Sequence, residues 1–395
     1  MKIIKYLVFI IISIFSKASP RFENKWIYIA SDGNRFAENS KYLYLNNVNK
    51  KEGKIEHIWI GASEEVIQEL RSNGFSAYYA NSIKAKYHLL TAGVAIETHG
   101  PQFGRYLSGA TIIDTHHGNA LKTMGSDKDV ERSSGGCVDY IKSRVWHRLV
   151  SISYLQVTNN GIPKETFKKA RQLTESEILI APYPRLDPFF KNDSMFKLGV
   201  NKQLLSEIQE KNQNRNVVIY APTWREAFEE KNGKALSNIC PDFKYINNLM
   251  ERTGSILYIS THPREPLEID YNKYEHISKL ETGGDIYPFL RYCDVLITDY
   301  SSIFYDFLFA DQPICFYAPD LAEYQATRGL YFEYKKHVPG PVSQSTSELI
   351  RDLNLALAGN DQYATNRSKR LSEFYIEVNK HPSEDTDKKI NEILQ

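Results

Sequence analysis

The chain has 395 residues, of which 42% are hydrophobic and 12% aromatic, so it is long enough for two domains and apolar enough to exclude disorder. Its 49 Lys and Arg against 48 Asp and Glu give a net charge of +1, which provides no excess positive charge for a nucleic-acid partner. A mean hydropathy of -0.44 excludes a protein with many membrane spans. The four cysteines form neither a CxxC pair nor a metal-ligand spacing, and they fit a reducing cytoplasm.

Residues 1–17, MKIIKYLVFIIISIFSK, form an apolar run flanked by Lys2, Lys5 and Lys17. The run is shorter than the roughly 20 residues that cross a bilayer. Two interpretations remain: the core of a signal peptide cleaved near Ala18 and Ser19, or a helix lying at a membrane interface. We favour a membrane-associating helix over residues 1–20, because the next predicted strand begins at residue 25.

From residue 25 the chain alternates short apolar runs with segments of helical periodicity, which predicts a parallel sheet wrapped by helices. The runs in this first part are residues 25–30, 57–62, 75–80, 94–98, 110–115, 149–157 and 177–184. Residues 191–214 are polar, rich in Lys, Asn and Gln, and show little apolar periodicity. We therefore predict a first α/β domain over residues 21–190 and a junction after it.

The same alternation returns beyond the polar stretch, in residues 216–224, 255–263, 276–280, 294–302 and 313–320. Two polar amphipathic helices, near residues 347–358 and 363–378, close the chain. These patterns predict a second α/β domain over residues 191–395, so the fold class is α/β with two doubly wound halves and an N-terminal apolar helix.

Ligands of open α/β sheets bind beyond the carboxyl ends of the strands, so the residues directly after each run are the candidates for a site. In the first half, His117 and Gly118 follow the run at 110–115. Glycine lets the backbone turn sharply there, and a histidine near its ordinary pKa suits a base that deprotonates a hydroxyl. The alternative is a histidine with a structural role, bonded within the fold.

Three strand ends in the second half carry phosphate-binding chemistry. Each ends in hydroxyl, Arg or His side chains: Thr223 and Arg225; His262 and Arg264; Thr298, Asp299, Ser301 and Ser302. A guanidinium fork matches a pair of phosphate oxygens, and Asp299, Ser301 or Ser302 could cap the following helix and leave its N–H groups for an anion. The alternatives are surface ion pairs and a plain N-cap.

Several catalytic patterns are absent from the sequence. It contains no GxxxxGK[ST] phosphate loop, no GxSxG elbow and no HExxH. The two DxD-like triplets, at residues 127–129 and 385–387, lie in polar segments away from strand ends, and we predict no metal site and no resident cofactor. Charge on a transferring phosphate would then be met by helix ends, His and Arg, while a need for divalent metal stays open.

Taken together, these motifs resemble the CDP-glycerol glycerophosphotransferase family, which builds teichoic acids and related capsule polymers. KWIYIASDGNRFAENSKYLY is similar to the family's opening segment, THHGNALKTMG to its "WHGTPLKxxG" and PYPRLDPFF to its "GxPRxD". VVIYAPTWRE, THPREP, DVLITDYSSIFYDF, DQPICFYAPDLAEY and RGLYFEYKKHVPGPV follow in the family's order. The resemblance covers residues 25–342, and the ordered combination is more specific than any single motif.

The resemblance implies the GT-B fold, in which two Rossmann-like domains face each other across a cleft. It implies transfer of glycerol phosphate from CDP-glycerol to a hydroxyl of a polyprenyl-diphosphate-linked acceptor, with release of CMP, by a peripheral protein on the cytoplasmic face of the cell membrane. His117 would be the general base and His262 would contact the donor phosphates. The substrate-binding residues would be Gly118, Arg185, Thr223, Arg225, Arg264, Thr298, Asp299, Ser301, Ser302 and Arg328, the last in a loop with Gly329.

The sequence departs from the family pattern at a few positions. His116 stands where the family has Trp, Pro182 and Leu186 alter the "GxPRND" element, and Ser260 replaces a basic residue. Three alternatives therefore stay open: a ribitol-phosphate transferase on the same scaffold, a GT-B glycosyltransferase that uses a nucleotide sugar, and a binding protein that has kept the fold without turnover.

Overall fold

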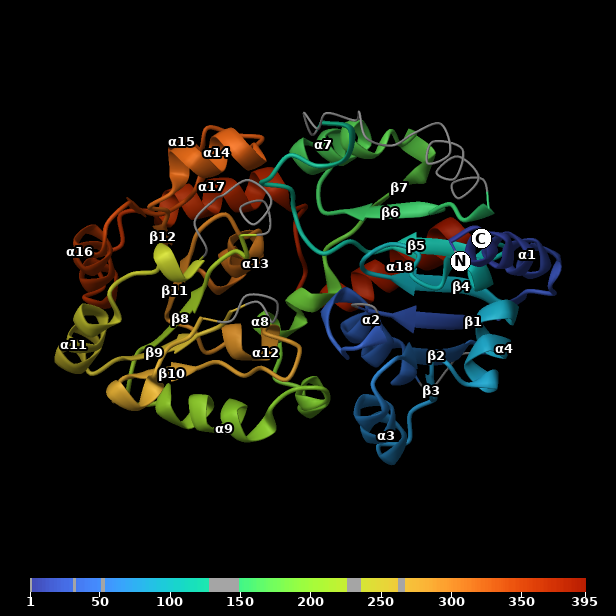
Figure 1. Cartoon of the computed structure of the whole chain (residues 1–395), viewed down its shortest axis with the longest axis horizontal. Helices are drawn as coiled ribbons and strands as arrows, with labels where there is room; N and C mark the ends of the chain where they lie inside the picture. The colour runs from blue at the N-terminus through green and yellow to red at the C-terminus, as the bar shows by residue number, and fades with distance from the viewer. Residues whose placement is uncertain (1, 31–32, 51–53, 128–148, 226–235, 262–266) are drawn as a thin grey trace. The chain divides into compact units, whose positions relative to one another are not determined.

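The computed structural model describes residues 2–30, 33–50, 54–127, 149–225, 236–261 and 267–395 (Figure 1). The chain forms two compact units. The first comprises Met1–His117, Asp129–Gly199 and Ile376–Gln395, and the second comprises Gly118–Lys128 and Val200–Tyr375. The chain therefore passes between the units four times, whereas the sequence predicted one junction near residue 190.

The first unit contains a parallel seven-stranded sheet in the order β3-β2-β1-β4-β5-β6-β7. Its strands coincide with the predicted apolar runs: β1 Phe22–Ile29, β2 Glu56–Gly61, β3 Ala77–Tyr79, β4 Ala92–Glu97, β5 Thr111–Asp114, β6 Tyr154–Val157 and β7 Ile178–Ile180. The runs are apolar because helices cover both faces of a parallel sheet. The strand order reverses between β1 and β4, where doubly wound folds bind ligands.

The helices of the first unit are α1 Lys2–Ala18, α2 Glu38–Val48, α3 Glu64–Ser72, α4 Ile83–Thr91, α5 Gly104–Leu107, α7 Ile162–Arg171, α8 Asp187–Phe190 and α18 Pro382–Leu394. Short 3-10 turns are Glu175–Glu177, Pro184–Leu186 and Ser194–Lys197. The apolar N-terminal run is thus helical. None of the helices in the described part of the chain has the length and apolarity that a membrane span requires.

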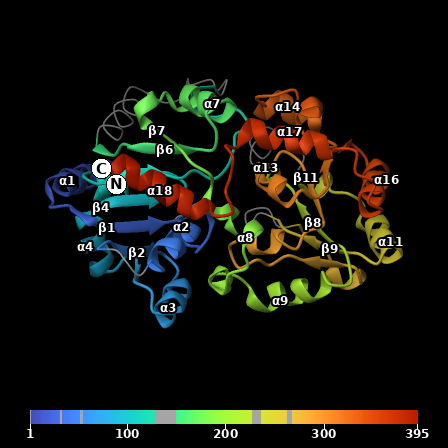
Figure 2. The same cartoon turned by 180° about the vertical axis from the view of Figure 1, so that it is seen from behind.

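The last helix, α18, corrects the predicted division, which assigned the chain end to the second domain. Figure 2 shows α18 lying against the first unit. Asp187 accepts hydrogen bonds from the Ser383 backbone N–H at 3.0 Å and from its hydroxyl at 2.8 Å. Ile390 is fully buried, and Asn47 of α2 donates to Asp387 at 2.7 Å. Polar contacts across distant segments fix this docking, and local periodicity does not reveal them.

The second unit contains a parallel six-stranded sheet in the order β10-β9-β8-β11-β12-β13, which repeats the arrangement of the first. Its strands are β8 Val217–Ala221, β9 Ile256–Ile259, β10 Ile277–Lys279, β11 Val295–Thr298, β12 Ile314–Tyr317 and β13 Val342–Ser343. The order reverses between β8 and β11, so the ends of these two strands mark this unit's ligand-binding position.

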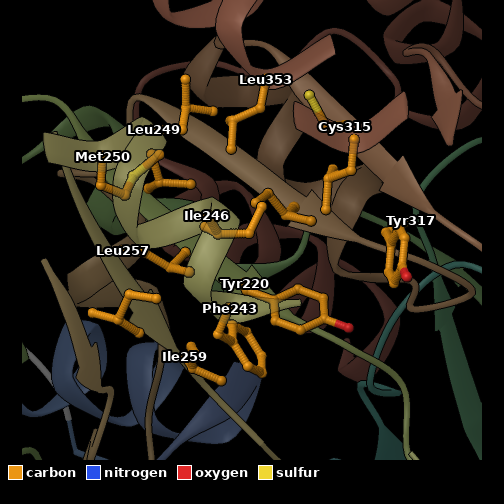
Figure 3. Close-up of a cluster of buried hydrophobic side chains, with 14 of the residues drawn as sticks. Tyr220, Phe243, Ile246, Leu249, Met250, Leu257, Ile259, Cys315, Tyr317 and Leu353 are labelled. Atoms are coloured by element: carbon orange, nitrogen blue, oxygen red, sulfur yellow. The ribbon is translucent and has the colours of Figure 1, made fainter. Parts of the chain in front are cut away.

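The helices of the second unit are α9 Lys202–Lys211, α11 Phe243–Thr253, α12 Tyr287–Leu290, α13 Ile303–Phe307, α14 Leu321–Arg328, α15 Tyr334–His337, α16 Thr346–Leu357 and α17 Ala364–Phe374, with 3-10 turns Leu236–Asn238, Tyr271–Lys273 and Leu308–Ala310. Figure 3 shows part of the core: Ile246 and Leu249 of α11 and Leu353 of α16 lie with side chains of the sheet. This packing holds the strand ends in register.

The polar stretch that predicted a junction contains α9. Asn201 caps it by accepting a hydrogen bond from the Leu204 N–H at 3.1 Å, and only Leu205 and Ile208 are buried. One buried apolar pair on an otherwise largely polar helix gives weak periodicity, which explains why the sequence did not predict this element. The boundary between the units lies at residues 199–200 instead of 190.

Candidate functional site

The ends of β1, β4 and β5 in the first unit are joined by a buried polar network. Glu97 and Asp114 pair across β4 and β5, so the residues after both strands lie at one edge of the sheet. The Asn39 amide donates to the carbonyls of Thr115 at 3.0 Å and His116 at 2.7 Å, and its oxygen accepts from the Arg185 N–H at 3.2 Å. Asn39 therefore fixes the backbone that presents His117.

His117 is exposed, and its imidazole lies against two other histidine rings. The His99 ring is stacked on it at 4.7 Å and 6°, and the His116 ring at 4.3 Å and 25°. His116 is buried, has a φ of 53° and meets Phe167 edge-on at 4.5 Å. At the position where the resembling family has Trp, His116 thus provides a flat ring that supports His117.

Two buried carboxyl groups lie at the ends of β4 and β5, close to these histidines in the chain. Burial raises the pKa of Asp114 to about 6, although the His116 N–H, which donates to Asp114 at 2.9 Å, lowers it. Burial also raises the pKa of Glu97 well above its ordinary value, and Glu97 accepts from the Gln102 N–H at 2.8 Å. Both groups help to order the turns after β4 and β5.

Arg185 lies inside the first unit and is 2% exposed. Its guanidinium lies 4.7 Å from the centre of the Tyr183 ring, and its backbone N–H donates to Asn39. The neighbouring Asp187 binds the start of α18 through Ser383. The predicted PRLD motif therefore connects the turn near His117 to the C-terminal helix.

Arg225 in the second unit is buried and paired with two carboxylates. Its Nη2 lies 2.8 Å from Asp299 Oδ2 and its Nε lies 2.9 Å from Asp320 Oδ2. Burial alone would lower the pKa of Arg225, but the Asp299 and Asp320 carboxylates outweigh burial and raise it. The side chain is 1% exposed, so the structure differs from the predicted open phosphate contact, and Arg225 orders the surrounding turn.

The turn after β11 also differs from the predicted N-cap. Asp299 accepts from the Thr223 N–H at 2.8 Å instead of capping a helix. The N-cap position is Ser302, whose side chain makes no capping hydrogen bond, and Ser301 Oγ accepts from the Ile303 N–H at 3.4 Å. The helix α13 has only five residues, and Ser301 and Ser302 at its start are half-buried.

The two predicted threonines lie at the ends of neighbouring strands. Thr298 is fully buried, and its hydroxyl donates to the Ala221 carbonyl at 2.8 Å, which ties β11 to β8. Thr223 Oγ1 is buried and makes no hydrogen bond. A buried hydroxyl without a partner is costly, which makes Thr223 Oγ1 a candidate ligand contact at this switch point.

The segment that begins at Gly118 belongs to the second unit, whereas His117 belongs to the first. Thr123 Oγ1 donates to the Arg328 carbonyl at 2.9 Å, and Arg328 Nη1 donates to the Thr123 carbonyl at 2.7 Å. Gly329 has a φ of 73°, and a Cβ there would lie 2.7 Å from Thr123 Oγ1. These contacts fasten the segment after His117 to the Arg328–Gly329 loop.

The structure leaves two predicted residues untested and adds four others. His262 and Arg264 lie outside the described residues. Within the described ranges, no group of three His, Cys, Asp or Glu could hold a metal ion. Sequence reasoning missed Glu38, Asn39, His99 and Asp320; His99 directly follows the predicted run at 94–98 and Asp320 ends the one at 313–320, so the strand-end rule would have found these two.

Comparisons with known proteins show which proteins this chain is similar to. A family model described as CDP-Glycerol:Poly(glycerophosphate) glycerophosphotransferase matches residues 12–390. The teichoic acid poly(glycerol phosphate) polymerase of Bacillus spizizenii is 26% identical over 382 residues, covering 95% of this chain and 93% of that protein. The teichoic acid ribitol-phosphate primase of the same species is 25% identical over 308 residues, covering 77% and 75%.

A solved structure shares the fold. A variant of the wall teichoic acid polymerase TagF soaked with CDPG has a TM-score of 0.75 at 21% identity, covering 97% of this chain and 92% of that one. This likeness confirms the predicted architecture of two parallel-sheet α/β units.

Proposed function

Because the chain belongs to the CDP-glycerol:poly(glycerophosphate) glycerophosphotransferase family, we propose that it transfers glycerol phosphate from CDP-glycerol to a hydroxyl of a membrane-lipid-linked acceptor and releases CMP. The product would be a teichoic acid or a capsule-type polymer. The observation that carries this proposal is the exposed His117 imidazole, held by flanking rings at the carboxyl edge of the first sheet, in a chain that matches the family over residues 12–390.

In the proposed reaction, His117 takes the proton of the acceptor hydroxyl. The acceptor oxygen then forms a bond to the phosphorus that bears glycerol, and the bond between this phosphorus and the oxygen of CMP breaks. We assign the donor phosphates to the second unit, where the Thr223 and Ser301 hydroxyls and Ser302 lie at strand ends. His262, Arg264 and Arg328 would add positive charge against the developing phosphate charge.

The proposal gives a structural role to three buried residues at these strand ends: Arg225, Asp299 and Thr298. The hydrogen bond from the Thr223 N–H to Asp299 fixes the backbone next to the Thr223 hydroxyl, which itself makes no hydrogen bond. Gly118 allows the sharp turn after the base, since its φ is 136°. Arg185 acts on the same turn through Asn39.

The test is CMP release by the purified full-length protein with CDP-glycerol and a lipid-disaccharide acceptor. Wild type should release CMP, and His117→Ala should reduce the rate by at least about 100-fold, the usual contribution of a general base. His381→Ala, which changes an exposed histidine of the same unit, should match wild type. Equal rates of CMP release by wild type and His117→Ala would contradict the proposal. Binding of CDP-glycerol without release of CMP would indicate a binding protein without turnover.

The donor alcohol needs its own experiment, because one relative is named a ribitol-phosphate primase and another a glycerol phosphate polymerase. Parallel reactions with CDP-glycerol, CDP-ribitol and a nucleotide hexose should give product only with CDP-glycerol. Mass spectrometry of the product identifies the alcohol and counts the units added. Product from CDP-ribitol alone would replace glycerol by ribitol in the proposal, and product from the hexose donor alone would favour a glycosyltransferase.

We also propose that α1 holds the protein peripherally on the cytoplasmic face of the cell membrane. The helix buries Ser13 and Ser16 and exposes Leu7, Ile11 and Phe15 by 52%, 65% and 63%. Ser13 and Ser16 thus face the protein together with Phe9, which is 8% exposed, whereas Leu7, Ile11 and Phe15 face outward, which suits a helix at a lipid interface.

The apolar surface continues beyond α1. Eight of the ten exposed large hydrophobic side chains among the described residues lie on α1, at the start of β1 or on α4. Arg21 connects the helices by donating to Ser16 O at 2.8 Å and Leu89 O at 2.9 Å, and both views show α1 and α4 at one end of the first unit (Figures 1 and 2). Exposed Lys17 and Lys84 would face anionic headgroups.

Vesicle flotation tests this membrane contact. Wild type should float with vesicles that contain about one-third anionic lipid. The double variant Ile11→Asp, Phe15→Asp should stay at the bottom of the gradient. Leu355→Asp, which places the same charge on an exposed apolar site of the second unit, should float like wild type. Flotation of the double variant at the wild-type level would refute the role of α1.

A further inference from the structure

We propose that His99 is a positioning residue for His117: its imidazole fixes the plane of the His117 ring, so that the nitrogen that takes the proton keeps its direction. This inference rests on the proposed function, because it assigns His99 a part in presenting the general base. His99 itself is assigned no contact with substrate.

The geometry of the two rings carries the inference. The His99 and His117 planes differ by 6°, with centroids 4.7 Å apart, although the residues belong to different turns. His117 is exposed, so part of its ring is open to solvent. An exposed imidazole ordinarily samples several staggered rotamers and a broad second torsion. Contact with His99 and His116 restricts this freedom before substrate binds.

His99 is suited to this task because its own position is fixed. It follows Thr98, whose fully buried hydroxyl lies 2.8 Å from the Ser40 hydroxyl and 3.4 Å from that of Thr115. These bonds join the end of β4 to α2 and to the turn after β5. The His99 backbone is therefore anchored to the same network that anchors His117.

A carboxylate lies beside the His99 ring, beyond hydrogen-bond distance. Glu38 Oε2 lies 3.7 Å from His99 Nδ1, and the two side chains are 21% and 33% exposed. Glu38 has a φ of 63°, a left-handed conformation that is strained for a non-glycine residue. Such strain persists where the surroundings fix it, and here the next residue is Asn39, which is bonded to Thr115 and His116. One strained turn thus supports both histidines.

Positioning of this kind affects the chemical step more than binding. A misplaced base slows proton transfer, because reacting atoms must be aligned to within a fraction of an ångström. Donor affinity should change little, since His99 belongs to the first unit and the donor phosphates are assigned to the second. The expected signature of a His99 change is therefore a lower kcat with nearly constant KM for CDP-glycerol.

The experiment compares three substitutions that separate ring shape from chemistry. His99→Ala removes the ring, His99→Leu keeps bulk without a flat face, and His99→Phe keeps a flat ring without nitrogens. We expect kcat to fall at least about tenfold in the Ala and Leu variants, with KM for CDP-glycerol within twofold, and to return to within about threefold of wild type in the Phe variant.

The outcomes separate this inference from the proposed function. Absence of CMP release by wild type, or full activity of His117→Ala, would refute the general-base proposal itself. If those controls behave as proposed, unchanged kcat in His99→Leu would overturn the positioning role. Equal losses in His99→Phe and His99→Leu would also overturn it, because the nitrogens would then be needed. If His99→Ala fails to fold, the comparison of His99→Phe with His99→Leu still tests the positioning role.

Discussion

Three side chains set the charge beside the turn after β11. Arg225 carries one positive charge, and the Asp299 and Asp320 carboxylates, both within 3 Å of its nitrogens, carry two negative charges. All three are almost fully buried. The group as a whole attracts no phosphate, so phosphate binding falls to the hydroxyls and to cations elsewhere. Arg225 instead neutralises carboxylates that would otherwise repel each other in the interior.

This interpretation predicts the effect of Arg225→Met. The substitution keeps an unbranched apolar stem but leaves two buried carboxylates without their partner, so the free energy of unfolding should fall by about 3–5 kcal/mol. Urea unfolding measures the change. Arg252→Met, which removes an exposed guanidinium of α11, should stay within about 0.5 kcal/mol of wild type. Normal stability of Arg225→Met with a raised KM for CDP-glycerol would instead show a direct phosphate contact.

Asp114 gives a prediction for pH. Burial raises its pKa to about 6, so between its unfolded pKa near 4 and pH 6 the folded state binds more protons than the unfolded state. Stability contributed by Asp114 is therefore full at low pH and falls as pH rises through this window. The loss is on the order of 2–3 kcal/mol for a shift of about two pKa units.

Asp114→Asn should remove this dependence, because an amide does not ionise and can still accept from the His116 N–H. Relative to wild type, the variant should gain stability as pH rises from about 4 to 6 and keep a constant advantage above that range. Urea unfolding of both proteins at several pH values measures the difference. A difference that stays flat across this window would mean that Asp114 keeps an ordinary pKa.

Single residues were predictable where a motif or a strand end identified them. His117, Thr223 and Ser301 could be chosen from sequence, because each follows an apolar run. The burial of Arg225 could not, since its partners Asp299 and Asp320 come from two other strands. The His99 and Glu38 contact was equally inaccessible, because it joins turns that lie 61 positions apart in the sequence.

At the scale of elements, the strands were predictable because parallel strands covered on both faces must be apolar. The helices were less so. α9 has one buried apolar pair, and α18 docks largely through Asp187, Ser383 and Asn47. The attachment of the segment after His117 was not predictable either. It depends on a contact between Gly329 and Thr123, which are far apart in sequence and meet only in the folded structure.

Gly329→Ala tests this attachment. A Cβ would lie 2.7 Å from Thr123 Oγ1 and would break the hydrogen bond from Thr123 to Arg328, in addition to the cost of a φ of 73°. The matched control is Gly254→Ala, where φ is 62° and nothing lies within 4 Å of the added Cβ.

Both variants carry the backbone cost of about 1–2 kcal/mol, and only Gly329→Ala should lose about 1 kcal/mol more from the broken hydrogen bond. It should also slow CMP release, since the segment begins directly after His117. Urea unfolding and the CMP assay measure both effects. Equal losses of stability and equal activity in the two variants would mean that the contact between Gly329 and Thr123 has no special role.

At the scale of the whole molecule, the units are interleaved along the chain. The first unit is completed by Ile376–Gln395, which follows the entire second unit in sequence. All strands of its sheet are therefore synthesised before its last helix. The buried Ile390 and the bonds from Ser383 to Asp187 make α18 part of the first unit's core.

A chain that ends at Tyr375 should consequently lose stability in the first unit alone. Removal of α18 uncovers the face of α2 and leaves Asp187 and the Pro182 carbonyl, which accepts from Thr386 at 2.6 Å, without their partners. Hydrogen exchange should accelerate in β1 and β4 by at least about tenfold and stay unchanged in β8 and β11, because local stability sets exchange rates. Adding a peptide of residues 376–395 in excess should restore protection through binding to the folded state. Equal acceleration in both sheets would show that the two units unfold as one, and no acceleration in either would show that α18 contributes nothing to the core.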